Sequence, residues 1–377
     1  MSKRKQIAVN TRFLIKGKLE GIGYFTNEIL RELVYQHPEV DFYFLFDRKF
    51  DPDFIFAENV KGIVLSPPAR HPFLWFLWFE CSVAFWLYHN KPDLFLSMDA
   101  FTTLNSTVPK VTVIHDLAFE HYPKHIGGLV MKYYKYFTPK YIAASKKVIA
   151  VSDYTKRDIA DLYKTDNSKI DIVYNVANEC YRPISYSEQL ETRALFSNGQ
   201  EFFVYVGSMH PRKNTKQLLI AFEHFKSSNS SDVKLLLIGR KAWQYGDIDV
   251  ALANMTHKND VVFLGHQPSS VTAKIVASAL AMCYVSLFEG FGIPIIEAQQ
   301  AGVAVITSNV SSMPEVAGAA AILVNPEDYL EIAAAMQKIY SDSAFKLQLV
   351  ALGHENCKRF TRQKSAESLW QSIQDFL

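Results

Sequence analysis

The stretch EGFGIPIIEAQQAG carries two glutamates, Glu289 and Glu297, eight positions apart. Two carboxyl groups can act as the acid and base of a glycoside hydrolase, and a retaining hydrolase places them about 5 to 5.5 Å apart. The number of residues between Glu289 and Glu297 does not determine the distance between their carboxyl groups. Pro294 suits the first position of a helix and Gly302 the residue beyond its end, so the sequence predicts a helix over 294–301. Glu289 then precedes the helix and Glu297 lies in its first turns, so both can face one cleft from different depths.

The residues between the glutamates suit the binding of an anion better than the cleavage of a neutral sugar. Gly290, Phe291 and Gly292 form a turn directly before the predicted helix. Backbone N–H groups at a helix start favour negative charge. Carboxylates near such a site can accept hydrogen bonds from sugar hydroxyls, each worth about 1.5 to 3 kcal/mol. We therefore interpret Glu289 and Glu297 as ligand-binding groups rather than as an acid and base.

The segment GSMHPRKN, residues 207–214, has a similar location between an apolar run and a helical pattern. Arg212 offers a planar fork of N–H donors and Lys213 a compact charge, and together they suit a diphosphate. A solvated pair of basic residues is the alternative. Gly207 and Ser208 begin the segment and are included among the expected ligand-binding residues.

Two further candidates lie in the first half of the chain. His115 and Asp116 follow the apolar run VTVI. A histidine at a strand end can bind a substrate hydroxyl or carbonyl, or it can belong to a structural turn, while Asp116 can orient it or cap the loop. Gly21 and Gly23 open a helical segment and either face a ligand or form a plain turn. They make a poor dinucleotide fingerprint, because Thr26 stands where the third glycine belongs.

The candidates follow apolar runs that alternate with helical patterns along the whole chain. In the first half the runs are IAV (7–9), FYFLF (42–46), IVL (63–65), LFL (94–96), VTVI (111–114) and VIAV (148–151). In the second half they are FFVYV (202–206), KLLLIG (234–239), VVFLG (261–265), AMCYV (281–285), VAVIT (303–307) and AILV (321–324). This alternation predicts two α/β units, each a doubly wound parallel sheet covered by helices. Such sheets bind ligands at the carboxyl ends of their strands, where the candidate residues stand.

Composition limits the classes of function. The chain of 377 residues is long enough for two domains, and its 40 basic and 38 acidic residues give a net charge of +2, which does not indicate a nucleic-acid partner. Its four cysteines form no CxxC pair, which argues against a zinc site or a disulfide framework. The aspartate pairs of DPD (51–53) and DID (247–249) are interpreted as loop charges, so no metal is expected. The start MSKRKQ lacks the apolar stretch of a signal peptide, so we expect a cytoplasmic protein.

The segment FLWFLWFECSVAFWLY, residues 73–88, is almost continuously apolar. It is shorter than the roughly 20 residues of a membrane span, and Glu80 lies near its centre. A buried or partly buried helix is the main interpretation, and a helix that also touches a membrane surface is the alternative. The lysine-aromatic run MKYYKYFTPKYI, residues 131–142, is read as an amphipathic helix with the same alternative.

Taken together and in order, these motifs resemble the retaining glycosyltransferases of family 4, and the likeness covers nearly the whole chain. It rests on GIGY, HDLAFEHYP from His115, VIAVSDYTKRDI from Val148, VGSMHPRKN from Val206, SLFEGFGIPIIEAQQAG from Ser286 and SNVSSMPEVAGAAAILVNP from Ser308. The resemblance implies the GT-B fold, with two Rossmann-like domains facing a central cleft. We place the first, acceptor-side domain at 1–180, a linker at 181–200 and the nucleotide-sugar domain at 201–360, with a closing helix at 361–377 that packs back on the first domain.

By the same resemblance, Arg212 and Lys213 would bind the diphosphate of a nucleotide sugar, Glu289 the hydroxyls of the transferred sugar, and Glu297 the ribose. His115 would contact the transferred sugar. The backbone around Gly290, Phe291 and Gly292 would meet sugar and phosphate, and the loop with Gly21 and Gly23 would lie near the phosphate and the acceptor. No cofactor or metal is required, since the nucleotide sugar is the substrate.

The resemblance leans toward mannosyl transfer from GDP-mannose to a glycan or lipid-linked glycan in cell-surface polysaccharide or lipopolysaccharide synthesis. A glucosyl or N-acetylhexosaminyl transferase that uses a UDP-sugar is the alternative within the same reaction class. Outside that class, the rival functions are a phosphorylase, an epimerase of nucleotide sugars and a non-catalytic nucleotide-sugar-binding protein. Location at the inner face of the cell membrane, through peripheral contact, is a further expectation.

Overall fold

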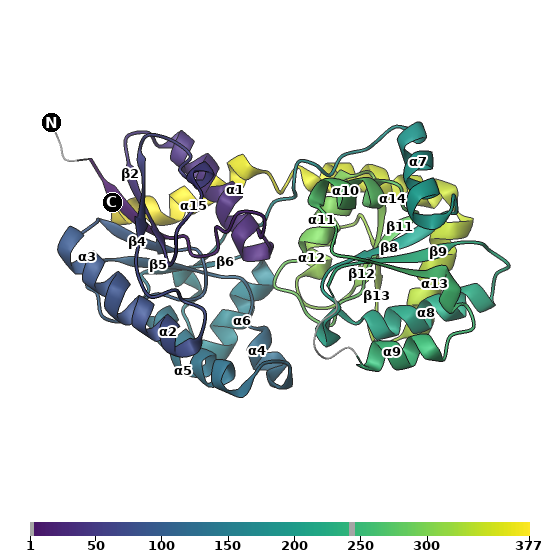
Figure 1. Cartoon of the computed structure of the whole chain (residues 1–377), viewed down its shortest axis with the longest axis horizontal. Helices are drawn as coiled ribbons and strands as arrows, with labels where there is room; N and C mark the ends of the chain where they lie inside the picture. Colours follow the sequence, from purple (N-terminus) through teal and green to yellow (C-terminus); the bar gives the residue numbers. More distant parts are fainter. Residues whose placement is uncertain (1–3, 241–245) are drawn as a thin grey trace. The chain divides into compact units, whose positions relative to one another are not determined.

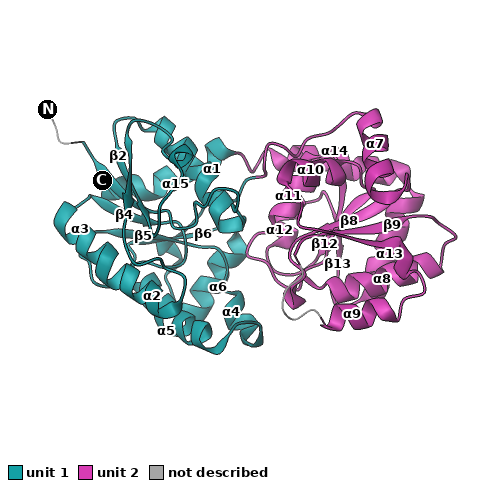
Figure 2. Ribbon diagram, in the orientation of Figure 1, with its two compact units in different colours: residues 1–176, 362–377 teal, residues 177–361 magenta. Residues whose placement is uncertain are grey.

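The computed structural model describes residues 4–240 and 246–377. The chain forms two compact units, Met1–Val176 with Arg362–Leu377, and Ala177–Thr361 (Figure 2). Each unit has its own parallel sheet with helices on both faces (Figure 1).

Unit 1 is built on a sheet of seven described strands in the order β3-β2-β1-β4-β5-β6-β7, and every pairing is parallel. The strands are β1 (Gln6–Asn10), β2 (Asp41–Phe46), β3 (Val60–Val64), β4 (Leu94–Ser97), β5 (Lys110–Ile114), β6 (Lys147–Ala150) and β7 (Ile170–Ile172). Strands β4 and β5 are buried throughout, because helices cover both faces of the sheet, and this explains their continuous apolar runs. The strand order reverses direction between β1 and β4, so their carboxyl ends form the crevice where such sheets bind ligands.

The helices of unit 1 are α1 (Gly21–Gln36), α2 (Pro72–Leu77), α3 (Ala84–Asn90), α4 (Ala118–His121), α5 (Gly128–Ala144), α6 (Asp153–Tyr163) and α15 (Arg362–Ile373). In Figure 1, α1 and α15 lie above the sheet, and α2, α3 and α5 lie below it. The chain therefore returns to unit 1 with its last helix. Trp370 of α15 stacks on His37, just beyond α1, with ring centroids 3.5 Å apart.

Unit 2 repeats the scheme with six described strands in the order β10-β9-β8-β11-β12-β13, again all parallel. The strands are β8 (Phe202–Val206), β9 (Lys234–Ile238), β10 (Val261–Gly265), β11 (Ala281–Tyr284), β12 (Ala304–Ser308) and β13 (Ile322–Val324). The helices are α7 (Tyr186–Ser197), α8 (Thr215–Ser227), α9 (Gly246–Ala253), α10 (Ser269–Ala277), α11 (Ile293–Gln300), α12 (Met313–Ala317), α13 (Tyr329–Ser341) and α14 (Ser343–Cys357). The order reverses between β8 and β11, which places the second ligand crevice there.

All twelve runs predicted as strands are confirmed. The thirteenth strand, β7, was missed because its three residues include Asp171 and it lies at the edge of the sheet. Short one-turn helices complete the chain at Pro52–Phe54, Pro123–His125, Asn167–Lys169, Pro211–Lys213, Lys258–Asp260 and Gln374–Phe376.

The predicted linker 181–200 is wrong in its secondary structure, because most of it forms helix α7 within unit 2. Ser185 and Glu188 make a reciprocal capping box at its start, and Asn198 ends it in the left-handed conformation. The serine and the Asn-Gly pair that suggested a connection are therefore helix boundaries. The two units meet in sequence at Val176 and Ala177 rather than at residue 180.

The apolar segment 73–88 forms one helical stretch, α2, a π-helical turn at Trp78–Val83 and α3. Glu80 is buried and accepts hydrogen bonds from the backbone N–H of Leu104 at 2.9 Å and of Asn105 at 3.2 Å, so its carboxylate fixes a neighbouring loop. One face is exposed, with Phe73, Phe85 and Tyr88 more than 60% accessible. No helix in the described part of the chain is long and apolar enough to cross a membrane.

Candidate functional site

The strand order of unit 2 brings the two predicted ligand-binding loops together. Strands β8 and β11 are neighbours in the sheet although more than seventy residues separate them. The loops that follow them are joined by hydrogen bonds from Leu287 N–H to the carbonyl of Arg212 at 2.9 Å and from the Asn214 amide to the carbonyl of Val285 at 3.0 Å. The segments GSMHPRKN and EGFG therefore form one site at the carboxyl edge of the sheet.

Glu289 lies at the centre of this site and is bound by both basic residues. Arg212 Nη1 is 3.1 Å from Glu289 Oε2, and Lys213 Nζ is 2.6 Å from Oε1. Lys213 Nζ also donates to the hydroxyl of Tyr284 at 2.9 Å, and Arg212 donates to the carbonyl of Phe288. Glu289 itself is only 6% exposed. We call Arg212, Lys213 and Glu289 the charged triad.

The triad is ionised and carries a net positive charge. Burial raises the pKa of Glu289, but the adjacent Lys213 and Arg212 outweigh burial and hold that pKa at about 2. At neutral pH two cations then face one carboxylate, which leaves one positive charge among the three side chains. This arrangement suits an anionic ligand that brings further negative charge.

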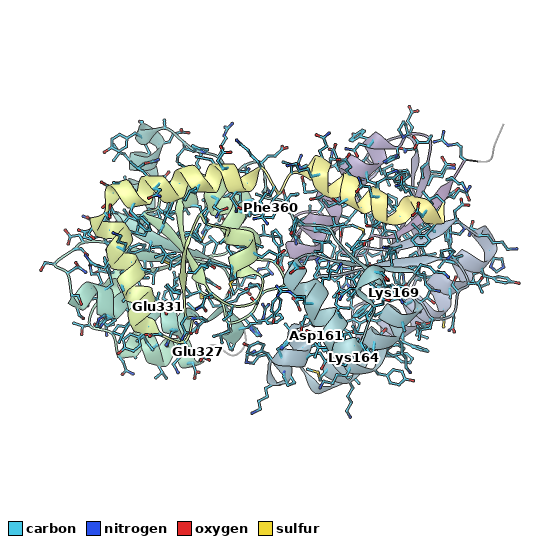
Figure 3. The ribbon with its side chains drawn as sticks, turned by 180° about the vertical axis from the view of Figure 1, so that it is seen from behind. Asp161, Lys164, Lys169, Glu327, Glu331 and Phe360 are labelled. Carbon is cyan, nitrogen blue, oxygen red and sulfur yellow. The ribbon has the colours of Figure 1, made fainter. Side chains whose placement is uncertain are left out.

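The glycine turn beside the triad is fixed by its own contacts. Gly292 has φ of 103°, a conformation that favours glycine, and caps the start of α11. Ser312 donates a hydrogen bond to the carbonyl of Glu289 at 2.9 Å and lies 2.8 Å from the carbonyl of Phe291. Phe291 packs edge-on against Phe360, labelled in Figure 3, with centroids 5.5 Å apart. The turn is therefore held in place by the chain itself.

The helix predicted over 294–301 is confirmed as α11, Ile293–Gln300. Pro294 lies in its first positions and Gly302 follows its end with φ of 75°. Glu297 projects from this helix toward the segment 178–181, where it hydrogen-bonds the side chain of Tyr181 and the backbone of Asn178. Burial raises the pKa of Glu297 to about 8. Glu289 and Glu297 therefore have different partners and opposite pKa shifts.

The loop after β8 approaches the loop after β9 through backbone alone. Gly207 has φ of 152°, and a Cβ atom there would lie 2.9 Å from the Tyr205 hydroxyl. A Cβ on Gly239 would lie 1.8 Å from the carbonyl oxygen of Gly207, so that position admits only glycine. Ser208 is exposed, and its carbonyl accepts a hydrogen bond from Tyr205 at 3.0 Å. Gly207 is thus explained by packing, and Ser208 remains open to a ligand.

Sequence reasoning missed several residues that shape this site. They are Tyr284, which binds Lys213, Ser311, which accepts a hydrogen bond from Glu289 N–H at 3.1 Å, Ser312 and Gly239. Ser311 and Ser312 follow β12, so the rule that ligand sites lie at strand ends could have identified them. Tyr284 lies inside an apolar run and carried no signal of its own.

In unit 1, His115 lies directly after β5. Its Nε2 donates to the carbonyl of Met98 at 2.9 Å, which assigns the proton to that nitrogen. Burial lowers the pKa of His115, so the ring is neutral at pH 7. Asp116 Oδ1 accepts from Ala118 N–H at 2.9 Å, which is the capping role rather than a direct hydrogen bond to His115.

The two glycines of GIGY differ in their surroundings. Both begin α1, as predicted. A Cβ on Gly23 would lie 2.6 Å from the carbonyl oxygen of Phe13, whereas nothing lies within 4 Å of one on Gly21. Close packing therefore explains Gly23, and only Gly21 has open space beside it.

The aspartate pairs have structural explanations in part. Asp51 and Asp53 lie 3.0 and 2.8 Å from Lys16 Nζ. Asp247 and Asp249 lie in the first turn of α9, not in a loop as predicted. Their negative charges there interact favourably with the positive end of the helix dipole. In residues 4–240 and 246–377, no group of three or more His, Cys, Asp or Glu side chains is placed to hold a metal ion. All four cysteines are free thiols.

Comparison with known families gives two matches that together span most of the chain. Residues 187–363 match the family Glycosyl transferases group 1, and residues 19–179 match Glycosyltransferase Family 4. The first match includes the charged triad and α11, and the second includes His115 and the GIGY glycines.

Individual relatives agree with the family matches. The chain is 28% identical to O-antigen chain mannosyltransferase B of Escherichia coli over 67% of its length and 66% of the relative's. It is 26% identical to O-antigen chain mannosyltransferase RfbU of Salmonella typhimurium strain LT2, over 82% of its length and 84% of the relative's. Among solved structures, HepE of Anabaena in complex with UDP and glucose superimposes with a TM-score of 0.72 at 14% identity, covering 99% of this chain and all of that one. Two Rossmann-like parallel-sheet units with such structural neighbours confirm the α/β GT-B fold.

Proposed function

Because the chain belongs to the group 1 glycosyltransferases of family 4, we propose that it transfers mannose from GDP-mannose to a glycan acceptor in cell-surface polysaccharide synthesis. The choice of mannose is supported by the two relatives named as O-antigen mannosyltransferases. The observation that carries the proposal is the charged triad, whose net positive charge lies beside a glycine turn and the start of α11.

The proposed reaction uses the triad to stabilise the leaving diphosphate. As the bond between sugar and diphosphate breaks, negative charge grows on the phosphate oxygens and positive charge on the sugar ring. Arg212, Lys213 and the start of α11 would stabilise the negative charge. Glu289 would accept hydrogen bonds from hydroxyls of the transferred mannose, since its low pKa keeps it an acceptor at neutral pH.

The binding of a donor would change the partners of the two basic residues. In the structure, Arg212 and Lys213 are directed at Glu289. A diphosphate would take over part of their hydrogen bonds, which leaves Glu289 oxygens available for sugar hydroxyls. Charge repulsion between Glu289 and the phosphate is offset because both share the same two cations.

We further propose that the anomeric configuration is retained. The acceptor hydroxyl would attack from the face on which the diphosphate leaves, and the departing phosphate oxygen would take its proton. Glu289 is a poor covalent nucleophile in this scheme, because two cations hold its electron density. His115, neutral and with Nε2 bound to Met98, is assigned to contact with the transferred sugar rather than to proton transfer.

A thermal-shift panel of nucleotide sugars tests the choice of donor. GDP-mannose at about 100 times its dissociation constant should stabilise the protein by about 2.7 kcal/mol, whereas UDP-glucose and UDP-N-acetylglucosamine should give no shift. A shift with UDP compounds alone would replace the GDP-mannose assignment by the UDP-sugar alternative. A shift with GDP-mannose, but no release of GDP with any mannose-terminated acceptor, would indicate a nucleotide-sugar-binding protein without activity.

We also propose that unit 1 makes a peripheral contact with a membrane surface. Phe73, Phe76, Phe85 and Tyr88 are exposed on α2 and α3, and α2 lies beside α5 (Figure 1). The exposed lysines of α5 are Lys132, Lys135 and Lys140. Aromatic rings and lysines in one area suit the headgroup region of an anionic bilayer.

Sedimentation with phosphatidylglycerol vesicles checks this contact. The double variant Phe73→Ser/Phe85→Ser should lose binding, while Tyr186→Ser, an equally exposed aromatic change in unit 2, should not. Equal sedimentation of both variants with the unaltered chain would contradict a contact through α2 and α3.

A further inference from the structure

Tyr284 is a buried residue at the charged triad to which the proposed reaction assigns no role. It is the last residue of β11 and is only 2% exposed. Its backbone carbonyl accepts a hydrogen bond from the hydroxyl of Thr307 at 2.7 Å, and Thr307 is its partner in the register of β12. The side chain of Tyr284 therefore starts from a fixed point at the carboxyl edge of the sheet in unit 2.

The hydroxyl of Tyr284 contacts two members of the triad at once. It accepts a hydrogen bond from Lys213 Nζ at 2.9 Å, and it also hydrogen-bonds the side chain of Glu289. Because Lys213 Nζ lies 2.6 Å from Glu289 Oε1, the three groups form a closed triangle of hydrogen bonds. A phenol oxygen can accept from an ammonium group while its O–H donates to a carboxylate. Both partners found for this hydroxyl among the described residues belong to the triad.

Packing alone does not explain a tyrosine at this position. Residues 281–283, which precede it in β11, are all buried and apolar. The ring of Tyr284 packs under the glycine turn, since a Cβ atom on Gly292 would lie 3.6 Å from Tyr284 Cε1. A phenylalanine ring would fill the same space. Burial of a hydroxyl costs free energy unless it is hydrogen-bonded, so the two charged partners account for its presence.

The hydroxyl of Tyr284 adds no charge to the triad. Burial, and then the negative charge of Glu289, raise the pKa of Tyr284 well above the usual value of 10, so the phenol is neutral at pH 7. A further carboxylate at this place would cancel the net positive charge of the triad. Lys213 Nζ also lies 5.2 Å from the centre of the tyrosine ring, where a cation is attracted to the aromatic face. Tyr284 can therefore hold Lys213 without weakening the attraction of the triad for an anion.

The triangle matters most when a donor replaces the direct ion pair. A diphosphate that takes over the bond from Lys213 to Glu289 would separate the ammonium from the carboxylate, and the hydroxyl of Tyr284 would still contact both. We propose that Tyr284 is a positioning residue for donor binding, whose hydroxyl keeps Lys213 directed at the diphosphate and Glu289 directed at the transferred sugar. This inference rests on the proposed function, because it concerns the same donor site.

Titration calorimetry with GDP and UDP tests the contact between Tyr284 and Lys213. Both probes carry a diphosphate and no sugar, so they report on Lys213 without the contacts of Glu289 to a sugar. Tyr284→Phe keeps the ring and should weaken binding of the better nucleotide by about 3- to 10-fold. Tyr141→Phe is the matched control, because it removes a buried hydroxyl of unit 1 that lies 2.9 Å from the hydroxyl of Tyr133. It should bind nucleotide normally even where its unfolding temperature falls.

A double-mutant cycle distinguishes positioning of Lys213 from a general loss of structure. If Tyr284 acts through Lys213, adding Tyr284→Phe to Lys213→Met should change nucleotide affinity by less than about 2-fold, because coupled residues have non-additive effects. Equal weakening by Tyr284→Phe with and without Lys213, or normal affinity of the single variant, would overturn the inference and leave the proposed function standing. Absence of GDP and UDP binding to the unaltered chain would overturn both.

Discussion

At the scale of single residues, the two glutamates that first suggested an acid and base have different environments. Glu289 is buried beside two cations and has a pKa of about 2, whereas burial without a cation raises the pKa of Glu297 to about 8. Carboxyl groups whose environments shift their pKa values apart can divide acid and base roles in other enzymes. Here their separate partners support two binding tasks, one at the triad and one against residues 178–181.

Removal of Lys213 tests the triad. Lys213→Met removes one of the two ion pairs of Glu289 and keeps the pair with Arg212, so the free energy of unfolding should fall by about 1 to 3 kcal/mol, the cost of a lost charged hydrogen bond. The double variant Lys213→Met/Glu289→Gln should be no more stable than the single variant, because it leaves the cation of Arg212 without its carboxylate. Urea unfolding measures both.

Measuring the affinity of the same variants for the donor distinguishes an effect on ligand binding from an effect on stability. Loss of one charged hydrogen bond to a diphosphate should weaken nucleotide-sugar binding by about 10- to 100-fold in the single and the double variant. A double variant with normal donor affinity, measured by titration calorimetry, would show that Lys213 does not hold the diphosphate.

Glu297 should make stability depend on pH. Its pKa is about 8 in the folded chain, against a reference value of 4.5, so the folded state holds a proton that the unfolded state releases. The contribution of Glu297 to stability therefore falls as pH rises from about 5 to about 8. Glu297→Gln has no proton to lose, so its stability relative to the unaltered chain should increase across that range.

Urea unfolding of the unaltered chain and of Glu297→Gln at about pH 5 and pH 8 checks this prediction. A difference in the free energy of unfolding between the two proteins that does not change with pH would contradict it. If ribose hydroxyls bind the carboxylate of Glu297, donor affinity should rise over the same pH range in the unaltered chain. The rise should be absent in Glu297→Gln.

At the scale of elements, the starts of helices carry most of the candidate site. α11 begins at the glycine turn, and the one-turn helix Pro211–Lys213 presents both basic residues, with the ring of His210 accepting a hydrogen bond from Arg212 N–H at 3.3 Å. Glycine is required at helix starts for two different reasons. At Gly292, before α11, the backbone has a positive φ, and at Gly23, in α1, neighbouring atoms leave no space for a side chain.

The glycines of α1 offer a matched pair. Gly23→Ala should destabilise the chain by about 1 to 3 kcal/mol, because its Cβ would meet the backbone oxygen of Phe13, which cannot move alone. Gly21→Ala has open space and should leave the midpoint of thermal unfolding within a few degrees. If Gly21→Ala weakens donor binding without loss of stability, a ligand approaches that glycine; equal destabilisation by both changes would contradict the packing explanation.

At the scale of the whole molecule, each unit brings distant segments of the chain to the carboxyl edge of its sheet. In unit 2 the ion pairs of the triad join residues 76 and 77 positions apart, and in unit 1 Arg12 and Asp99 are 87 positions apart. Both sets of ion pairs lie at the two adjacent strands between which the strand order of the sheet reverses. The same topology thus brings ionised side chains together at the carboxyl edge of each sheet.

The last helix, α15, should stabilise unit 1 alone. Leu369 and Ile373 are fully buried, and Trp370 stacks on His37. Trp370→Ala should increase amide hydrogen exchange in α1 and leave β8 to β13 unchanged. Glu367→Ala, an exposed change on the same helix, should alter neither. Faster exchange throughout unit 2 in Trp370→Ala would show that α15 stabilises more than the unit to which it belongs.

The sequence by itself determined the α/β class, twelve of the thirteen described strands, the helix over α11 and the identity of the triad residues. These features depend on local properties, since an apolar run, a proline at a helix start and a glycine with positive φ act within a few residues. The resemblance of six motifs to one family added the prediction of the GT-B fold to these local features.

Only the tertiary structure decided which side chains meet. It placed Glu289 between Lys213 and Arg212, directed Glu297 at residues 178–181 and paired Arg12 with Asp99 in unit 1. The order of the strands determines which of these side chains come into contact. That order depends on packing across the whole sheet rather than on neighbours in sequence. For the same reason the pKa values of two glutamates eight positions apart could move in opposite directions.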